Sequence, residues 1–122
     1  MPIPWTRSGP SFGFGDVAPH LPQPQDFGES SVEAEDGDPE STLSLYRRAL
    51  AARRRLQQGE ALTWLESGSE VVAFARHDGW RSVTNFGTAP VPLPAGTVVV
   101  ASGPLDGVAP GLLPGETTVW LA

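Results

Sequence analysis

The chain has 122 residues and a formal net charge of −6, because 14 Asp and Glu residues outweigh 8 Arg and no Lys occurs. A sequence-independent nucleic-acid binder needs a cationic surface to displace counterions, so this balance argues against that class. No apolar run is long enough for a membrane span, and the first residues lack the features of a signal peptide. The absence of Cys excludes a disulfide framework and a thiolate-ligated metal. We therefore expect a small cytoplasmic protein.

Charge is segregated along the chain. Residues 1–40 hold eight acidic residues and one Arg, residues 41–58 hold five Arg and no acidic residue, and residues 59–122 hold six acidic residues and two Arg. The acidic and basic stretches are neighbours, so they can neutralise each other locally.

Residues 1–37, here called the access loop, are predicted to be an irregular loop. Six Pro residues occur before position 25, and each removes a backbone donor and disfavours helix at the preceding residue. The loop also holds large apolar side chains, which are unsuited to a solvated tail. Unstructured loops of this length are uncommon in small domains, so we expect this one to lie on other structure, either the rest of this chain or a larger body outside it.

Residues 38–58 are predicted to form one long helix. Asp38 is a suitable N-cap, Pro39 suits the first helical position, and Gly59 follows Gln57 and Gln58 as a stop. Its apolar residues cover an arc about half the circumference wide, broader than a surface helix usually has. Such a helix needs two packing partners.

Residues 59–122 are predicted to form an antiparallel β-sandwich, which makes the fold class α+β. The alternation of side chains and the turn residues indicate strands at 61–65, 70–76, 80–86, 91–93, 97–101 and 117–121. The tripeptide His77-Asp78-Gly79 is a hairpin turn signal. We expect the run at 97–101 to be buried, and Trp64, Trp80 and Trp120 to lie in the core.

Motifs for a catalytic or metal site are weak. Gly13 to Ala18 match G-x-G-x-x-A, but a dinucleotide site needs that turn between a strand and a helix, and here Pro residues flank it. His20 and His77 lack the spacing of metal ligands. The acidic residues before the helix are typical of solvation and of helix-dipole complementation. We therefore expect no catalytic residue, metal ligand or cofactor site in this chain.

Aromatic residues of the access loop are the candidates for ligand binding. Aromatic rings stack on apolar faces of ligands such as sugars, and loops on a rigid scaffold commonly carry function. We predict Trp5, Phe12 and Phe14 as substrate-binding residues.

An ordered set of segments resembles the C-terminal end of glycoside hydrolase family 13, in the α-glucosidase and oligo-1,6-glucosidase branch. The set comprises Pro2-Ile3-Pro4-Trp5, Gly13-Phe14, Leu21-Pro22-Gln23-Pro24, Val32-Glu33-Ala34-Glu35, Asp38-Pro39-Glu40-Ser41 and Leu45-Tyr46-Arg47-Arg48-Ala49-Leu50. The β portion is similar to the family's small C-terminal domain in order and pattern. The family commonly has Gln where Glu35 stands.

The resemblance implies a place for each part. Residues 1–37 would follow the eighth strand of a (β/α)8 barrel, whose loops at that end line the active site. Residues 38–58 would be the last barrel helix, and residues 59–122 the antiparallel C-terminal domain. The family's retaining mechanism uses an Asp nucleophile, a Glu acid/base and a second Asp, all upstream of the Pro-Ile-Pro-Trp segment. The resemblance therefore implies a chain that is not catalytically competent alone, with a missing N-terminal barrel as partner and a small α-glucoside or oligosaccharide as substrate.

Two alternatives remain open at this point. The chain could be a stand-alone carbohydrate-binding or structural module, which would need an exposed aromatic platform. It could also be a truncated reading frame without an independent role, which predicts poor solubility of the isolated chain.

Overall fold

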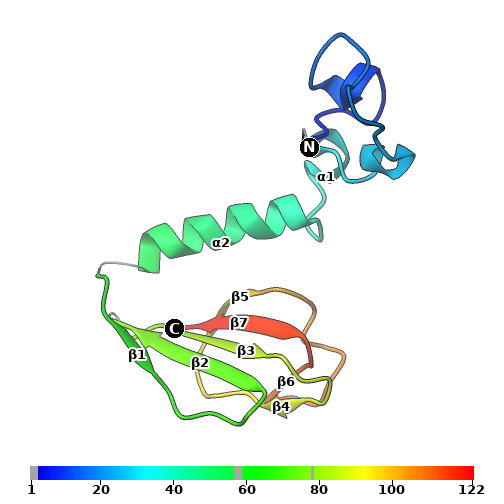
Figure 1. Ribbon diagram of the computed structural model, residues 1–122. Coiled ribbons are helices and arrows are strands. Elements are labelled where there is room, and N and C mark those ends of the chain that lie inside the picture. Colours follow the sequence, from blue (N-terminus) through cyan, green and yellow to red (C-terminus); the bar gives the residue numbers. More distant parts are fainter. Residues whose placement is uncertain (1–2, 57–58, 78) are drawn as a thin grey trace. The chain divides into compact units, whose positions relative to one another are not determined.

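The computed structural model describes residues 3–56, 59–77 and 79–122. Contacts divide the chain into two compact units, Met1–Arg47 and Arg48–Ala122, so the boundary falls inside the long helix α2, Thr42–Leu56 (Figure 1). The three-part division predicted from the sequence places its boundaries elsewhere, after residues 37 and 58. In the described part of the chain, no helix combines the length and apolar character that crossing a membrane requires.

The first unit contains three short helical turns within the predicted irregular loop. They are the 3-10 turns η1, Pro10–Gly13, and η2, Gln25–Gly28, and the single α-helical turn α1, Val32–Glu35. Ser31 explains the start of α1, because its fully buried side-chain oxygen accepts a hydrogen bond from Ala34 N at 3.2 Å. The Ser31 hydroxyl donates to the carbonyl of Gly28 at 2.7 Å. The start of α1 depends on these side-chain hydrogen bonds, which periodicity does not reveal.

Helix α2 begins at Thr42, which is later than predicted from Asp38 and Pro39. The Asp38 side chain instead accepts from the backbone N–H of Glu40 at 2.9 Å and so forms a turn of its own. Ser41 is the cap that the structure uses: its Oγ accepts from Ser44 N at 3.2 Å. Asp38 and Ser41 both have side chains that can cap a helix, and the structure uses the buried Ser41. The predicted end at Gln57 and Gln58 lies outside the described residues.

The predicted neutralisation between acidic and basic stretches has one visible example. Arg47 donates from Nη1 to Asp36 Oδ1, and both side chains are more than half exposed. Exposed ion pairs contribute little to stability. This pair therefore adds only modestly to the first unit.

The second unit contains two antiparallel sheets, which confirms the predicted fold class. The five-stranded sheet has the order β1 (Leu62–Trp64), β2 (Val71–Arg76), β3 (Arg81–Asn85), β7 (Thr117–Leu121), β5 (Val98–Ala101). The smaller sheet pairs β4 (Val91–Pro92) with β6 (Leu112–Leu113). Figure 1 shows β7, the last strand of the chain, between β3 and β5.

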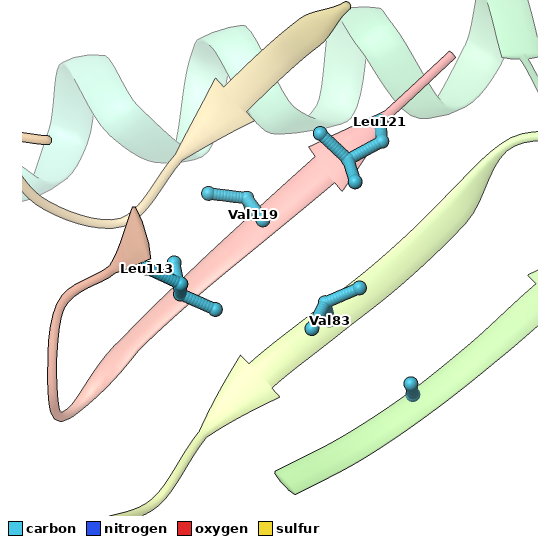
Figure 2. Close-up of a cluster of buried hydrophobic side chains, with 5 residues drawn as sticks. Val83, Leu113, Val119 and Leu121 are labelled. Carbon is cyan, nitrogen blue, oxygen red and sulfur yellow. The ribbon is translucent and has the colours of Figure 1, made fainter. Parts of the chain in front are cut away.

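The core of the second unit contains side chains from both sheets. Val83 of β3 lies opposite Val119 of β7 in the strand register, and Ala73 of β2 lies opposite Val83. These three, with Leu121 and with Leu113 from the smaller sheet, form one buried cluster. Figure 2 shows the labelled members of this cluster. Burial of apolar side chains from two layers is the main stabilising contribution in such a sandwich.

The second unit also holds a buried polar centre at Asn85. The side-chain amide of Asn85 donates to the carbonyls of Ala89 at 2.9 Å and Pro114 at 3.1 Å, and its oxygen accepts from Gly87 N at 3.0 Å. Asn85 is fully buried. It therefore joins the end of β3 to the segment that leads into β7.

Two predictions about burial in the β portion are wrong. Trp64 is 69% exposed and lies on the short edge strand β1, which pairs with β2 on one side and has no described strand on the other. Its ring meets Phe74 edge-on at 5.9 Å. Val98, in the run expected to be buried, is 39% exposed on the opposite edge strand β5. Trp80 is buried as expected, and its ring lies 5.1 Å from that of Trp120.

The predicted hairpin joins β2 to β3. Gly79 has φ +83°, a left-handed conformation that glycine adopts without strain, and its N–H donates to the carbonyl of Arg76 at 2.9 Å. Asp78, the other residue of the turn signal, lies outside the described residues.

Candidate functional site

The backbone of Trp5 is held from both sides within the first unit. Trp5 N donates to the carbonyl of Phe12 at 2.8 Å, and the carbonyl of Trp5 accepts from Glu33 N at 3.0 Å. The adjacent residue Pro4 accepts from Val32 N at 3.0 Å. The segment therefore runs between the η1 turn and the start of α1. Trp5 itself is half exposed, so a fixed backbone presents a large aromatic side chain to the outside.

Phe12 lies in a turn of unusual backbone conformation. Ser11, Phe12 and Gly13 have φ of +48°, +49° and +75°, which places three consecutive residues in the left-handed region. Non-glycine residues there cost about 1–3 kcal/mol each and persist only where the surroundings determine them. The carbonyl of Phe12 accepts from both Trp5 N and Thr6 N, at 2.8 and 3.0 Å. Strained backbone of this kind is typical of functional sites.

The third predicted residue, Phe14, is exposed and lines a groove. The groove has a volume of about 580 Å³ and is formed by residues between Ser11 and Gln23, here called the loop groove. Phe14 is 61% exposed, whereas the half-buried Phe12 ring packs 6.2 Å from Phe27. A backbone hydrogen bond thus brings Trp5 and Phe12 together. Phe14 lies apart from them, in the wall of the loop groove.

Sequence reasoning missed one polar residue of this region. Gln23 lines the loop groove, and its Nε2 is buried with no hydrogen-bond partner. Ser11, which is buried, donates from Oγ to the carbonyl of Val17 at 2.7 Å and so links two lining residues. A single Gln in a Pro-rich segment carries no pattern that would identify it.

Other chemistry considered from the sequence gains no support from the geometry. Within the described residues, no group of three His, Asp or Glu side chains could hold a metal ion. The motif from Gly13 to Ala18 begins at the last residue of η1, and neither the strand nor the helix of a dinucleotide site flanks it. His20 lines the loop groove, and His77 lies in the β2–β3 turn.

Comparison with known proteins gives one match among curated sequences. No protein-family model matches the chain. The chain is 36% identical over 85 residues to a probable α-glucosidase of Rhizobium meliloti (strain 1021), a match that covers 67% of this chain and 15% of that protein. The chain therefore spans a small fraction of the length of this relative.

Solved structures share the fold across nearly the whole chain. Isomaltulose synthase from Klebsiella sp. LX3 matches with a TM-score of 0.79 at 23% identity, over 99% of this chain and 24% of that one. An α-glucosyl transfer enzyme matches with a TM-score of 0.70 at 28% identity, over 99% of this chain and 25% of that one. The chain thus corresponds to about a quarter of each.

Proposed function

This chain is the counterpart of the C-terminal region of glycoside hydrolase family 13 enzymes, and from that premise we propose that it completes a cytoplasmic, retaining α-glucosidase-type hydrolase of small α-glucosides. In this role it supplies a loop at the rim of the active site and a structural β domain. The catalytic carboxylates belong to a barrel outside residues 1–122. The substrate is a small α-glucoside or oligosaccharide, and the chain itself uses no cofactor.

One observation carries the proposal. The identity of 36% to a probable α-glucosidase extends over 85 residues, and the fold agrees over 99% of the chain with that of an enzyme whose name describes α-glucosyl transfer. Retaining glycosidases need two carboxylates about 5 Å apart on opposite sides of the scissile bond. A loop beside such a pair can hold the sugar without taking part in bond cleavage.

The geometry of the first unit suits a rim loop. Trp5 is half exposed on a backbone that hydrogen bonds hold from both sides. An aromatic face of this kind packs on the C–H face of a sugar ring and costs little conformational entropy on binding. The strained turn at Ser11 and Phe12 fixes the position of Trp5 through the Phe12 carbonyl.

A chimaeric enzyme tests the proposal. In the probable α-glucosidase of Rhizobium meliloti, the region equivalent to residues 1–122 is replaced by the whole of this chain, and hydrolysis of p-nitrophenyl α-glucoside is measured. We expect the chimaera to fold and to hydrolyse the substrate. A folded chimaera without activity, beside an active parent, would show that this region cannot complete such a site.

Substitutions in the chimaera test the role of the rim loop. Trp5→Ala should raise KM with a smaller effect on kcat, because it removes binding that the ground state and the transition state share. Trp64→Ala is the matched control, since Trp64 is an exposed tryptophan of the other unit. An equal change in KM for the two variants would speak against a rim role for Trp5.

The alternative is a stand-alone carbohydrate-binding module. Exposure of Trp5 and Phe14, at 50% and 61%, favours it. Titration of the isolated chain and of the chimaera with maltose or isomaltose, followed by Trp fluorescence, distinguishes the two hypotheses. A stand-alone module binds with an affinity that fusion to a barrel does not alter, whereas a rim loop gains affinity in the chimaera.

A further inference from the structure

The loop groove differs from the surface of Trp5 in both lining and chemistry. It is bounded by residues 11 to 23, and Trp5 does not line it. Its volume of about 580 Å³ lies within the range of small-molecule sites, about 300–1,000 Å³. Its wall is mainly apolar and includes Phe14, Val17 and Leu21. Sites of this size commonly combine an apolar wall with a few polar groups that orient the ligand.

The polar groups of the loop groove point to a neutral ligand with oxygen acceptors. None of the described lining residues is an Asp, Glu or Arg, and His20 is the one titratable side chain among them, so the wall offers no permanent charge to an ionic ligand. Gln23 Nε2 is buried and has no acceptor. A buried amide N–H without an acceptor is destabilising, and a ligand oxygen would relieve that cost. The last torsion of a glutamine side chain is broad, so a modest rotation can bring the amide to a ligand oxygen.

The backbone around the groove is preorganised. Ser11 lines the groove and belongs to the left-handed turn, and its Oγ holds the carbonyl of Val17 at 2.7 Å. A Cβ on Gly13 would lie 2.7 Å from Thr6 Oγ1, so the turn packs closely on the Trp5 segment. Strain that the surroundings maintain is common at ligand clamps. A preformed wall lowers the entropy cost of binding.

We propose that the loop groove is a subsite for a neutral sugar ring, in which Phe14 is the platform and the Gln23 amide donates to a ring or hydroxyl oxygen. A pyranose fits both features, because its C–H face packs on an aromatic ring and its oxygens accept hydrogen bonds. The choice of a sugar rests on the proposed function. The groove, the unpaired Gln23 amide and the absence of Asp, Glu and Arg from the described lining rest on the structure alone.

The test uses the ¹⁵N-labelled 122-residue chain and titration with methyl α-glucoside, followed by NMR. We expect shifts in the Gln23 side-chain amide and in backbone amides of residues 11–23. Tetrahydropyran, a ring of the same shape without hydroxyl groups, should bind more weakly. Gln23→Leu should weaken sugar binding about fivefold, the factor expected from one net hydrogen bond. Gln25→Leu is the matched control, since Gln25 is exposed and does not line the groove, and it should bind like the original chain.

The possible outcomes distinguish a failure of the proposed subsite from a failure of the proposed function. Equal sugar affinity for Gln23→Leu and Gln25→Leu, or tighter binding of tetrahydropyran than of the sugar, overturns the subsite. An active chimaera whose groove takes no sugar also overturns the subsite and leaves the proposed function standing. An inactive chimaera with sugar in the groove supports the subsite and overturns the proposed function. If Gln23→Leu disturbs the loop, Gln23→Met retains the unbranched shape and gives the same comparison.

Discussion

The carboxylate of Glu35 accepts a hydrogen bond from the backbone N–H of Leu43, with 2.8 Å between Glu35 Oε2 and Leu43 N. Leu43 lies in the first turn of α2, where backbone N–H groups have no partner within the helix. Glu35 is the last residue of α1. The bond therefore joins the short helix to the start of the long one and complements the helix dipole with a negative charge.

Substitution of Glu35 should destabilise the first unit. We expect Glu35→Ala to lower the free energy of unfolding by about 1 kcal/mol, because a capping acceptor and a favourable charge are lost. Glu35→Gln keeps an acceptor and should cost about half as much. Urea denaturation followed by far-UV circular dichroism measures both. The exposed Glu29→Ala serves as control, and a loss of the same size there would disprove the capping role.

Substitution of Asn85 should destabilise the second unit strongly. Asn85→Leu keeps the volume of the side chain but leaves Gly87 N and the carbonyls of Ala89 and Pro114 without their partner. Buried groups left unsatisfied cost about 1–3 kcal/mol each, so we expect a loss of about 3 kcal/mol. Denaturant unfolding followed by Trp fluorescence gives the value. A loss no larger than that of the exposed Thr88→Ala would show that the amide is dispensable.

Substitution of Gly28 should disturb the packing of the access loop. A Cβ at Gly28 would lie 2.3 Å from the carbonyl oxygen of Arg7, and backbone cannot yield as a flexible side chain does. We expect Gly28→Ala to cost about 2 kcal/mol. Gly15→Ala is the matched control, since nothing lies within 4 Å of a Cβ there. Amide hydrogen exchange of the first unit should accelerate in Gly28→Ala and remain unchanged in Gly15→Ala, and the reverse order would refute the steric argument.

Truncation of Leu113 should test the core between the two sheets. Leu113 is fully buried although β6 is only two residues long. We expect Leu113→Ala to lower the free energy of unfolding by about 3 kcal/mol, the range of buried leucine truncations. Leu62→Ala, at a position that is 41% exposed, should cost under about 1 kcal/mol. Comparable losses at the two positions, measured by denaturant unfolding, would mean that Leu113 is not part of a packed core.

Much of the β portion could be predicted because its strands alternate between two environments. Ala73 is buried and its neighbour Val72 is 40% exposed, which is the alternation expected of a strand at 70–76. Strand β6 was not predicted, since two residues cannot show a period. The exposure of Trp64 could not be predicted from the sequence either, because it depends on which strand forms the edge of the sheet.

The candidate site was predictable in residue type but not in geometry. The aromatic character of Trp5, Phe12 and Phe14 is visible in the sequence, whereas the left-handed turn and its backbone hydrogen bonds to the Trp5 segment are not. The groove residue Gln23 becomes a candidate only when its burial and its missing acceptor are known. The start of α2 could not be fixed either, because Asp38 and Ser41 both have the chemistry of a cap.

The proposed role of this chain is to complete an α-glucosidase-type active site without carrying its carboxylates. The most direct measurement is the initial rate of p-nitrophenyl α-glucoside hydrolysis by the purified 122-residue chain and by the chimaera, in one assay. We predict no rate above the buffer blank for the isolated chain and clear turnover for the chimaera. If hydrolytic activity copurifies with the isolated chain through successive separation steps, the proposed role is wrong.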